Sequence, residues 1–404
     1  MDPRTNPYTP NAGARPQVLV GRDDQLELFD ILLARLQRGR TEQSMIITGL
    51  RGVGKTVLLG QFRMKALEQR WVVVELEAQK HNDRDFRRDI AARMRTALFE
   101  LAPGRKWSEG LKHAAQVLKN FNFTVSDTGS MSFGFDVDSL DGYADHGDLT
   151  MDLADLFIAV GEAAKENKRG VVLLFDEVQF LAADQLEALI QALHKCVQRE
   201  LPITFVGAGL PQIAELAGDA KSYAERLFKF PNIKELSYMD AKQALKLPAE
   251  EEGVKFDEDA LDRAVEISGA YPYFLQELGY AVWSIADGDN ITIADIDQVI
   301  PRYESKLDES FFRVRLDRAT ELQRAYMRAM AELGAGPQKA ADVAEVMGRS
   351  SQNLAPVRKS LIDMGLLYAP DHGYASFTVP HFDQFLKRAM PELVVPPVRS
   401  KKYK

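Results

Sequence analysis

The segment Gly49–Thr56 constrains this chain more than any other, because it matches the phosphate-binding pattern G-x-x-x-x-G-K-S/T. The apolar run Ser44–Thr48 before it predicts a strand, and a helical pattern starts at Val57. A glycine-rich loop between a strand and a helix turns backbone N–H groups and a helix N-terminus toward an anion. The alternative is a chance glycine-rich turn, which the acidic pair described next disfavours.

The loop residues have separate predicted roles toward a nucleotide. Lys55 is expected to reach the β- and γ-phosphates, and the Thr56 hydroxyl to bind Mg²⁺. Glycines allow the backbone to approach phosphate oxygens where a Cβ would clash. The other predicted nucleotide contacts come from Gly49, Leu50, Arg51, Gly52, Val53, Gly54 and Val57.

A second apolar strand, predicted over Gly170–Phe175, ends in Asp176 and Glu177. At the carboxyl edge of a parallel sheet this pair would stand beside the loop, where Asp176 is expected to bind Mg²⁺. Glu177 is then placed to polarise a water for in-line attack on the γ-phosphorus. No guanine-recognition signal of the N/T-K-x-D type lies at a suitable place, which favours ATP over GTP. The predicted reaction is ATP hydrolysis with Mg²⁺.

Composition and charge narrow the class of protein. The 404 residues suffice for two or three domains, and 46% hydrophobic with 27% charged residues is typical of a folded protein. No apolar run approaches a membrane span, no signal peptide is visible, and the single cysteine, Cys196, predicts a buried thiol in a cytoplasmic setting. The net charge is −8, but from Glu321 onward 12 Lys/Arg face 8 Asp/Glu, which allows nucleic-acid contact there.

The order of patterns predicts an α/β P-loop NTPase fold with a parallel sheet, a helical lid and a C-terminal winged helix. Alternating apolar segments around a turn also predict a hairpin over 122–137. It is surrounded by aspartates, for which a solvated loop is favoured over a metal site or a partner-facing insertion. The expected segments are a disordered arm (1–17), the α/β domain (18–237, with an insertion at about 121–150), the helical lid (238–317), the winged helix (318–390) and a basic tail (391–404).

The winged-helix prediction rests on a helix-turn-helix pattern over 340–364 and a strand-turn-strand pattern over 366–379. Pro356 suggests that the second helix begins near residue 354 or 355, with the proline in its first turn. Many winged helices bind proteins instead of DNA, so both partners stay open. The predicted DNA contacts are Ser351, Gln352 and Asn353 at base edges, and Arg358 and Lys359 at phosphates.

Several segments together resemble the AAA+ and STAND ATPases, most closely the Orc1/Cdc6-like ATPases with a C-terminal winged helix. The resemblance covers about residues 16 to 390. It implies a 5-1-4-3-2 strand order, an adenine site at Val20, Gly21 and Arg22, and a nucleotide-sensing lid element at Tyr271 and Pro272. The segments that carry it are Leu19–Asp23, the loop, Phe175–Glu177, Val206–Gly209 and Gly269–Pro272.

Two departures from that family suggest slow hydrolysis. Gly207-Ala208-Gly209 stands where the family has a polar residue near the γ-phosphate, and no arginine follows Gly269 where a lid arginine is expected. The resemblance also implies that Arg226 reaches a γ-phosphate, often that of a neighbouring subunit, although an ion pair with Glu225 or a surface position is an equal alternative.

The resulting hypothesis is a slowly hydrolysing, ATP-dependent switch in which ATP sits between sheet domain and lid, associated with duplex DNA through its winged helix. The first alternative is a STAND-like signalling switch whose winged helix contacts a protein or masks the site. The second is a nucleotide-binding scaffold with little turnover. Expected partners are ATP, ADP, duplex DNA, an unidentified protein and further copies of the chain assembling on ATP binding, with no membrane contact.

Overall fold

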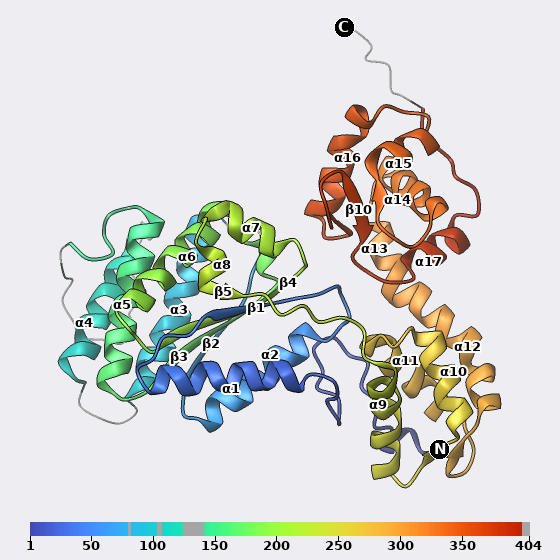
Figure 1. The fold of residues 1–404 in the computed structure, drawn as a ribbon, viewed down its shortest axis with the longest axis horizontal. Coiled ribbons are helices and arrows are strands. Elements are labelled where there is room, and N and C mark those ends of the chain that lie inside the picture. The colour runs from blue at the N-terminus through green and yellow to red at the C-terminus, as the bar shows by residue number, and fades with distance from the viewer. Residues whose placement is uncertain (80–81, 103–106, 124–139, 141, 398–404) are drawn as a thin grey trace, which may run out of the picture. The chain divides into compact units, whose positions relative to one another are not determined.

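The computed structural model describes residues 1–79, 82–102, 107–123, 140 and 142–397. The chain divides into two compact units, whose elements are labelled in Figure 1. One unit, here called the sheet unit, comprises Gly21–Gly49 and Gly54–Ile233. The other, here called the helical unit, comprises Met1–Val20, Leu50–Val53 and Lys234–Lys404.

A five-stranded parallel sheet in the order β2-β3-β4-β1-β5 forms the centre of the sheet unit. This is the order that the family resemblance implied, so the predicted parallel sheet and its strand order are confirmed. Thr48 pairs with Gly209, and Phe175 pairs with Gly207, so the carboxyl ends of β1, β3 and β4 meet at one edge. The strands are β1 (Ser44–Thr48), β2 (Val72–Glu77), β3 (Val171–Asp176), β4 (Ile203–Gly209) and β5 (Phe228–Lys229).

Helices cover both faces of this sheet (Figure 1), which is why β3 and β4 are continuous apolar runs. Helices α1 (Asp23–Gln37) and α2 (Lys55–Glu68) pack on one face. The larger core lies on the other face, against α3 (Asp83–Leu101), α4 (Glu109–Phe123), α5 (Leu149–Glu166) and α6 (Ala183–Gln198).

Two short helices and a short strand end the sheet unit. The helices are α7 (Ile213–Ala220) and α8 (Ala224–Leu227), which are separate because Lys221 has an extended backbone. Strand β5 comes next and is followed by one bridge between Thr48 and Asn232. Residues 122 and 123 of the predicted hairpin belong to α4, and the remainder lies outside the described residues.

Where the sequence predicts the lid, the helical unit contains four longer helices and one short helix. Two short strands, β6 (Lys255–Phe256) and β7 (Asn290–Ile291), pair in parallel between them. A π-helical turn, Asp308–Phe312, and the short helix α13 (Arg313–Asp317) follow the last of the longer helices. The lid helices are α9 (Tyr238–Glu251), α10 (Glu258–Ser268), α11 (Pro272–Trp283) and α12 (Ile293–Leu307).

The N-terminal arm is ordered against these helices, so the expectation of a disordered arm is wrong. Tyr8 is 1% exposed, and its hydroxyl donates to the Leu245 carbonyl. The Trp283 indole donates to the Asp2 carbonyl at 3.0 Å. A Cβ at Gly279 would lie 2.7 Å from the Tyr8 ring, so the glycine makes room for the tyrosine. Proline-rich composition alone did not reveal the buried aromatic anchor.

The C-terminal part of the helical unit has the order helix, strand, helix, helix, strand, strand of a winged helix, with the strands arranged β8-β10-β9. Helix α16 begins at Ser351, because the Ser350 hydroxyl accepts from the Asn353 N–H. Pro356 therefore lies inside α16, which corrects the predicted start near residue 354. The elements are α14 (Glu321–Leu333), β8 (Gln338–Lys339), α15 (Ala340–Val346), α16 (Ser351–Asp363), β9 (Leu367–Tyr368), β10 (Tyr374–Phe377) and α17 (Phe382–Ala389).

In the described part of the chain, none of the helices combines the length and the apolar character needed to span a bilayer. Those residues also contain no cluster of His, Cys, Asp and Glu side chains that could hold a metal ion on its own. Of the predicted acidic cluster, Asp145 accepts from the Gly142 N–H and Asp148 caps α5. Asp136, Asp138 and Asp141 lie outside the described residues.

Candidate functional site

The glycine-rich loop joins β1 to α2 and has the backbone that its sequence predicts. Gly52 and Gly54 have φ angles of 86° and 95°, in the left-handed region that favours glycine. Helix α2 begins at Lys55, directly after Gly54. An added Cβ at Gly54 would meet no atom within 4 Å, so the loop has open space there. A left-handed turn opening a helix beside free space fits a bound phosphate group.

The phosphate-binding loop and the Asp176–Glu177 pair meet at the carboxyl edge of the sheet. The Thr56 hydroxyl donates a 2.6 Å hydrogen bond to Asp176 Oδ2 across 120 positions of sequence. Lys55 is 7% exposed, and its ammonium group donates to the Gly49 carbonyl at 3.0 Å. Hydroxyl and carboxylate oxygens are ligands that Mg²⁺ accepts, and an ammonium at the loop suits a phosphate. The donor set therefore fits Mg²⁺ and a nucleotide.

Glu177 has an unusual backbone for a residue other than glycine. Its φ of 53° and ψ of 37° are left-handed, a conformation that costs on the order of 1–3 kcal/mol. Its N–H donates to Asp176 Oδ1 at 2.8 Å, and its carboxylate accepts from the Gln179 amide. Strain of this kind persists where the surroundings hold it and is concentrated at functional sites. Nothing in the sequence signals this conformation.

Burial raises the pKa of Asp176 above its ordinary value. The hydrogen bonds from Thr56 and from the Glu177 N–H oppose this shift, and the negative charge of Glu177 adds to it. At neutral pH an ionised Asp176 therefore carries an electrostatic cost that a bound cation would relieve.

The predicted adenine residues are divided between the units. Arg22 is 7% exposed at the start of α1, and its Nη1 donates to the Gly21 carbonyl at 2.9 Å. Gly21 has a φ of 65°, so glycine is favoured at this bend. Val20 belongs to the helical unit and is partly buried.

The tip of the loop, Leu50–Val53, belongs to the helical unit and lies against the predicted sensing element within it. The Tyr273 N–H donates to the Gly52 carbonyl at 3.2 Å, and the Tyr271 ring lies 3.6 Å from where a Gly52 Cβ would be. Pro272 opens α11 as its first residue. The Tyr271 hydroxyl is buried without a hydrogen-bond partner in the described part of the chain. The structure thus brings Tyr271 and Pro272 to the loop tip and adds Tyr273.

The loop tip makes a second contact, with the end of β10, which the sequence does not indicate. Within the helical unit, the Arg51 N–H donates to the Thr378 carbonyl at 3.0 Å. Thr378 is fully buried directly after β10, and its hydroxyl donates to the Gly365 carbonyl at 2.8 Å. One backbone donor of the phosphate-binding loop is therefore already engaged by the winged-helix region.

Arg226 lies at the opposite edge of the sheet from Thr56. It precedes β5, whose Phe228 pairs with Ser44 at the start of β1, whereas Thr56 follows the end of β1. At about 3.3 Å per residue the two ends of β1 are roughly 13 Å apart. Arg226 is exposed and forms no ion pair with a described residue, Glu225 included.

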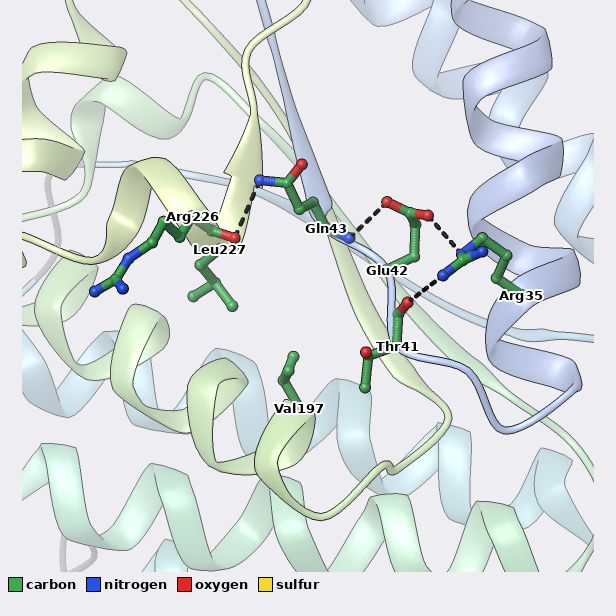
Figure 2. A pocket seen from close by; sticks show the side chains of 7 residues that line it. All are labelled: Arg35, Thr41, Glu42, Gln43, Val197, Arg226 and Leu227. Carbon is green, nitrogen blue, oxygen red and sulfur yellow. Dashed lines mark hydrogen bonds and ion pairs between the residues drawn. The ribbon is translucent and has the colours of Figure 1, made fainter.

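A cavity of about 200 Å³ lies beside Arg226. Gln43 Nε2 donates to the Arg226 carbonyl at 3.0 Å, and Figure 2 shows the guanidinium pointing away from the other lining side chains. The cavity is lined by Arg35, Thr41, Glu42, Gln43, Val197, Arg226 and Leu227.

The predicted DNA contacts differ in exposure. Lys359 and the three polar residues at the start of α16 are exposed. Arg358 is half-buried, its Nη1 is enclosed without a hydrogen-bond partner among the described residues, and its charge lies near Tyr326. The three exposed polar residues are Ser351, Gln352 and Asn353.

The family model of the AAA ATPase domain matches residues 18–206. A second model, described as a domain of unknown function, matches residues 309–386. The match to the ATPase family covers the strand, loop and carboxylates of the site, so the recognition of an ATPase domain from the sequence is confirmed.

Individual proteins are also similar to this chain. The Walker-type ATPase of Pyrococcus abyssi is 14% identical, with a TM-score of 0.59 over 92% of this chain and 97% of that chain, and shares its fold. Cdc6p of Pyrobaculum aerophilum is 15% identical, with a TM-score of 0.47 over 96% and 99%. An uncharacterized HTH-type transcriptional regulator of Methanocaldococcus jannaschii is 23% identical over 365 residues, covering 88% of this chain and 84% of the relative.

The raised pKa of Asp176 predicts how its replacement changes stability. The stabilisation from this carboxyl is fully present below its unfolded pKa near 3.8 and is lost as the pH rises through the higher folded pKa. Asp176→Asn, which carries no charge, should therefore raise the melting midpoint of the nucleotide-free chain at pH 8. The gain should be about 2–4 °C for each kcal/mol, and should shrink as the pH falls.

Melting curves between pH 4.5 and 8 measure this effect, with Asp219→Asn in α7 as an exposed control that should change little. The same Asp176 variant should lose the extra stability that Mg-ATP confers. A lower midpoint for Asp176→Asn at pH 8, or a difference independent of pH, contradicts the account.

Proposed function

We propose that this chain hydrolyses ATP at the edge of its sheet and acts as a nucleotide-dependent switch. The observation that carries the proposal is the hydrogen bond between Thr56 and Asp176, with Glu177 directly beside it. A loop that binds phosphate, a cation-binding pair and an adjacent carboxylate together supply what phosphoryl transfer to water requires.

In this reaction the water oxygen forms a bond to the γ-phosphorus as the bond from that phosphorus to the β,γ-bridging oxygen breaks. Glu177 accepts the proton from the water, and ADP and inorganic phosphate are released. Lys55 is placed to bind the β- and γ-phosphates from the loop. Thr56 and Asp176 would hold Mg²⁺, which supplies positive charge to the phosphate oxygens.

The switch is supported by the engaged loop donor of Arg51. Its N–H is one of the loop groups that face phosphate in the proposed complex, yet here it donates to the Thr378 carbonyl at 3.0 Å. A phosphate oxygen and this carbonyl compete for one donor, so nucleotide binding and the Thr378 contact oppose each other. The nucleotide state would in this way change the winged-helix region.

Two substitutions separate binding from turnover. Lys55→Ala should abolish measurable ATP affinity, because it removes the ammonium that meets the phosphates. Glu177→Gln should retain ATP binding and lower kcat by about 10²–10⁴-fold, because an amide cannot accept the proton. Filter binding and phosphate release measure the two effects, with Lys112→Ala as an exposed control in α4. Full ATP affinity in Lys55→Ala would rule out this site, and unchanged turnover in Glu177→Gln would rule out its base.

We infer that Arg226 acts on the site of a neighbouring copy. It is exposed at the edge of the sheet away from its own Thr56, so only a second copy can bring it to a γ-phosphate. An arginine delivered in this way neutralises charge that develops in the transition state. Turnover would then depend on assembly of the chain when ATP binds.

Mixing two inactive variants tests this dependence. Lys55→Ala keeps Arg226 but binds no ATP, whereas Arg226→Ala binds ATP but lacks the arginine. Each alone should lose about 10³-fold or more of kcat, and the mixture should recover a substantial part of the activity. The rate of phosphate release by the mixture, compared with that of each variant at the same total concentration, measures the recovery. No recovery together with full activity of Arg226→Ala alone contradicts the role.

Duplex DNA is the partner we propose for the winged helix, with a protein partner as the alternative. The exposed start of α16 carries Ser351, Gln352 and Asn353, which suit base edges, and Lys359 suits a phosphate. Arg358 is the weakest of the predicted contacts because its guanidinium is partly enclosed. The HTH-type regulator among the relatives supports the choice of DNA.

Salt dependence distinguishes the two partners. The full chain should bind duplex DNA with an affinity that falls steeply with salt, and Lys359→Ala should reduce the slope by about 0.9. Lys387→Ala, an exposed lysine on α17, is the matched control and should leave the slope unchanged. Fluorescence anisotropy on labelled duplexes at several salt concentrations measures both. Absence of salt-sensitive binding would favour the protein partner.

A further inference from the structure

The carboxyl end of β4 has no room for the polar side chain that the family places there. A Cβ on Gly209 would lie 2.8 Å from Gln179 Oε1 and 2.8 Å from Val178 Cγ2. A Cβ on Gly207 would lie 3.1 Å from Val178 Cγ1. The short 3₁₀ turn Val178–Phe180, which follows Glu177, therefore fills this space. Gly207 and Gly209 thus leave room for the Val178 and Gln179 side chains.

Gln179 brings a polar group into this space from the turn. Its Oε1 accepts from the Leu210 N–H at 3.0 Å, and its Nε2 donates to Glu177 Oε2. An N–H can only donate and an ionised carboxylate can only accept, so these two partners determine which way the amide faces. Gln179 thus bridges the end of β4 and the carboxylate next to Asp176.

A series of hydrogen bonds connects this bridge to the phosphate-binding loop. The Gly49 N–H donates to the Gly209 carbonyl at 3.2 Å, and Leu210, the next residue, donates to Gln179. Glu177 has a left-handed backbone, and its carboxylate is held by the glutamine. The position of the carboxylate is therefore set relative to the start of the loop.

We propose that Gln179 is a positioning residue for ATP hydrolysis, which takes the place of the polar residue missing from β4 and orients Glu177 toward the attacking water. The inference rests on the proposed ATPase function. It revises the expectation drawn from Gly207–Gly209, because the polar group is present but comes from a different segment. Misplacing a reacting carboxylate by about 1 Å can cost on the order of 10²-fold in rate.

Three substitutions of Gln179 separate orientation from packing. Gln179→Met fills a similar volume without hydrogen bonds, and should lower kcat by about 10- to 100-fold with little change in KM and in melting midpoint. Gln179→Ala should have a similar effect on kcat. Gln179→Glu retains an acceptor for Leu210 but places a second carboxylate beside Glu177. Repulsion between the two carboxylates should displace Glu177 and lower the kcat of Gln179→Glu at least as far as that of Gln179→Met.

Steady-state phosphate release by the full chain measures kcat and KM of all three variants beside the unaltered chain, Glu177→Gln and the exposed control Gln198→Ala. Turnover that is lost in Glu177→Gln but retained in Gln179→Met shows a packing role only and overturns the inference while leaving the proposed function intact. A rise in KM with unchanged kcat also overturns it. No turnover by the unaltered chain overturns both proposals.

Discussion

The hydrogen bond from the Thr56 hydroxyl to the Asp176 carboxylate determines what the rest of the sheet unit must provide. It connects the start of α2, which follows β1, to the end of β3. In the sheet, β4 lies between β1 and β3. The parallel register brings the ends of β1, β3 and β4 to one edge, where the loop and both carboxylates lie. Burial of Asp176 at this edge raises its pKa, so the folded chain keeps a carboxylate there at an electrostatic cost. A site for a cation explains why such a group is retained.

Two groups of contacts near this bond link the proposed chemistry to the proposed switch. Glu177 is held in a strained backbone by its neighbours, and Gln179 ties its carboxylate to the end of β4. On the helical unit, the loop tip is engaged through Gly52 and Arg51. Nucleotide binding would thus affect two groups of hydrogen bonds. One group orients the Glu177 carboxylate, and the other occupies the Arg51 N–H of the loop.

Features that depend on local sequence were predictable. The loop, Asp176 and Glu177 follow apolar strands directly, so their place at the sheet edge could be predicted from the pattern. Gln179 could not, because its role depends on β4, which is about 30 positions away and packs against it only in the folded chain. Burial of Tyr8 depends in the same way on Gly279 and Leu245. The predicted start of α16 near residue 354 is wrong because the Ser350 cap outweighs the proline at position 356.

The dependence of ATP binding on Mg²⁺ tests directly whether this site binds a nucleotide together with a cation. Titration calorimetry of the unaltered full chain with ATP, in Mg²⁺ and then in excess chelator, reports whether Thr56 and Asp176 bind a cation together with the nucleotide. We expect the affinity for ATP to fall at least about tenfold without Mg²⁺, equivalent to roughly 1.4 kcal/mol. Equal affinity with and without Mg²⁺, or no binding of ATP at all, would contradict this expectation.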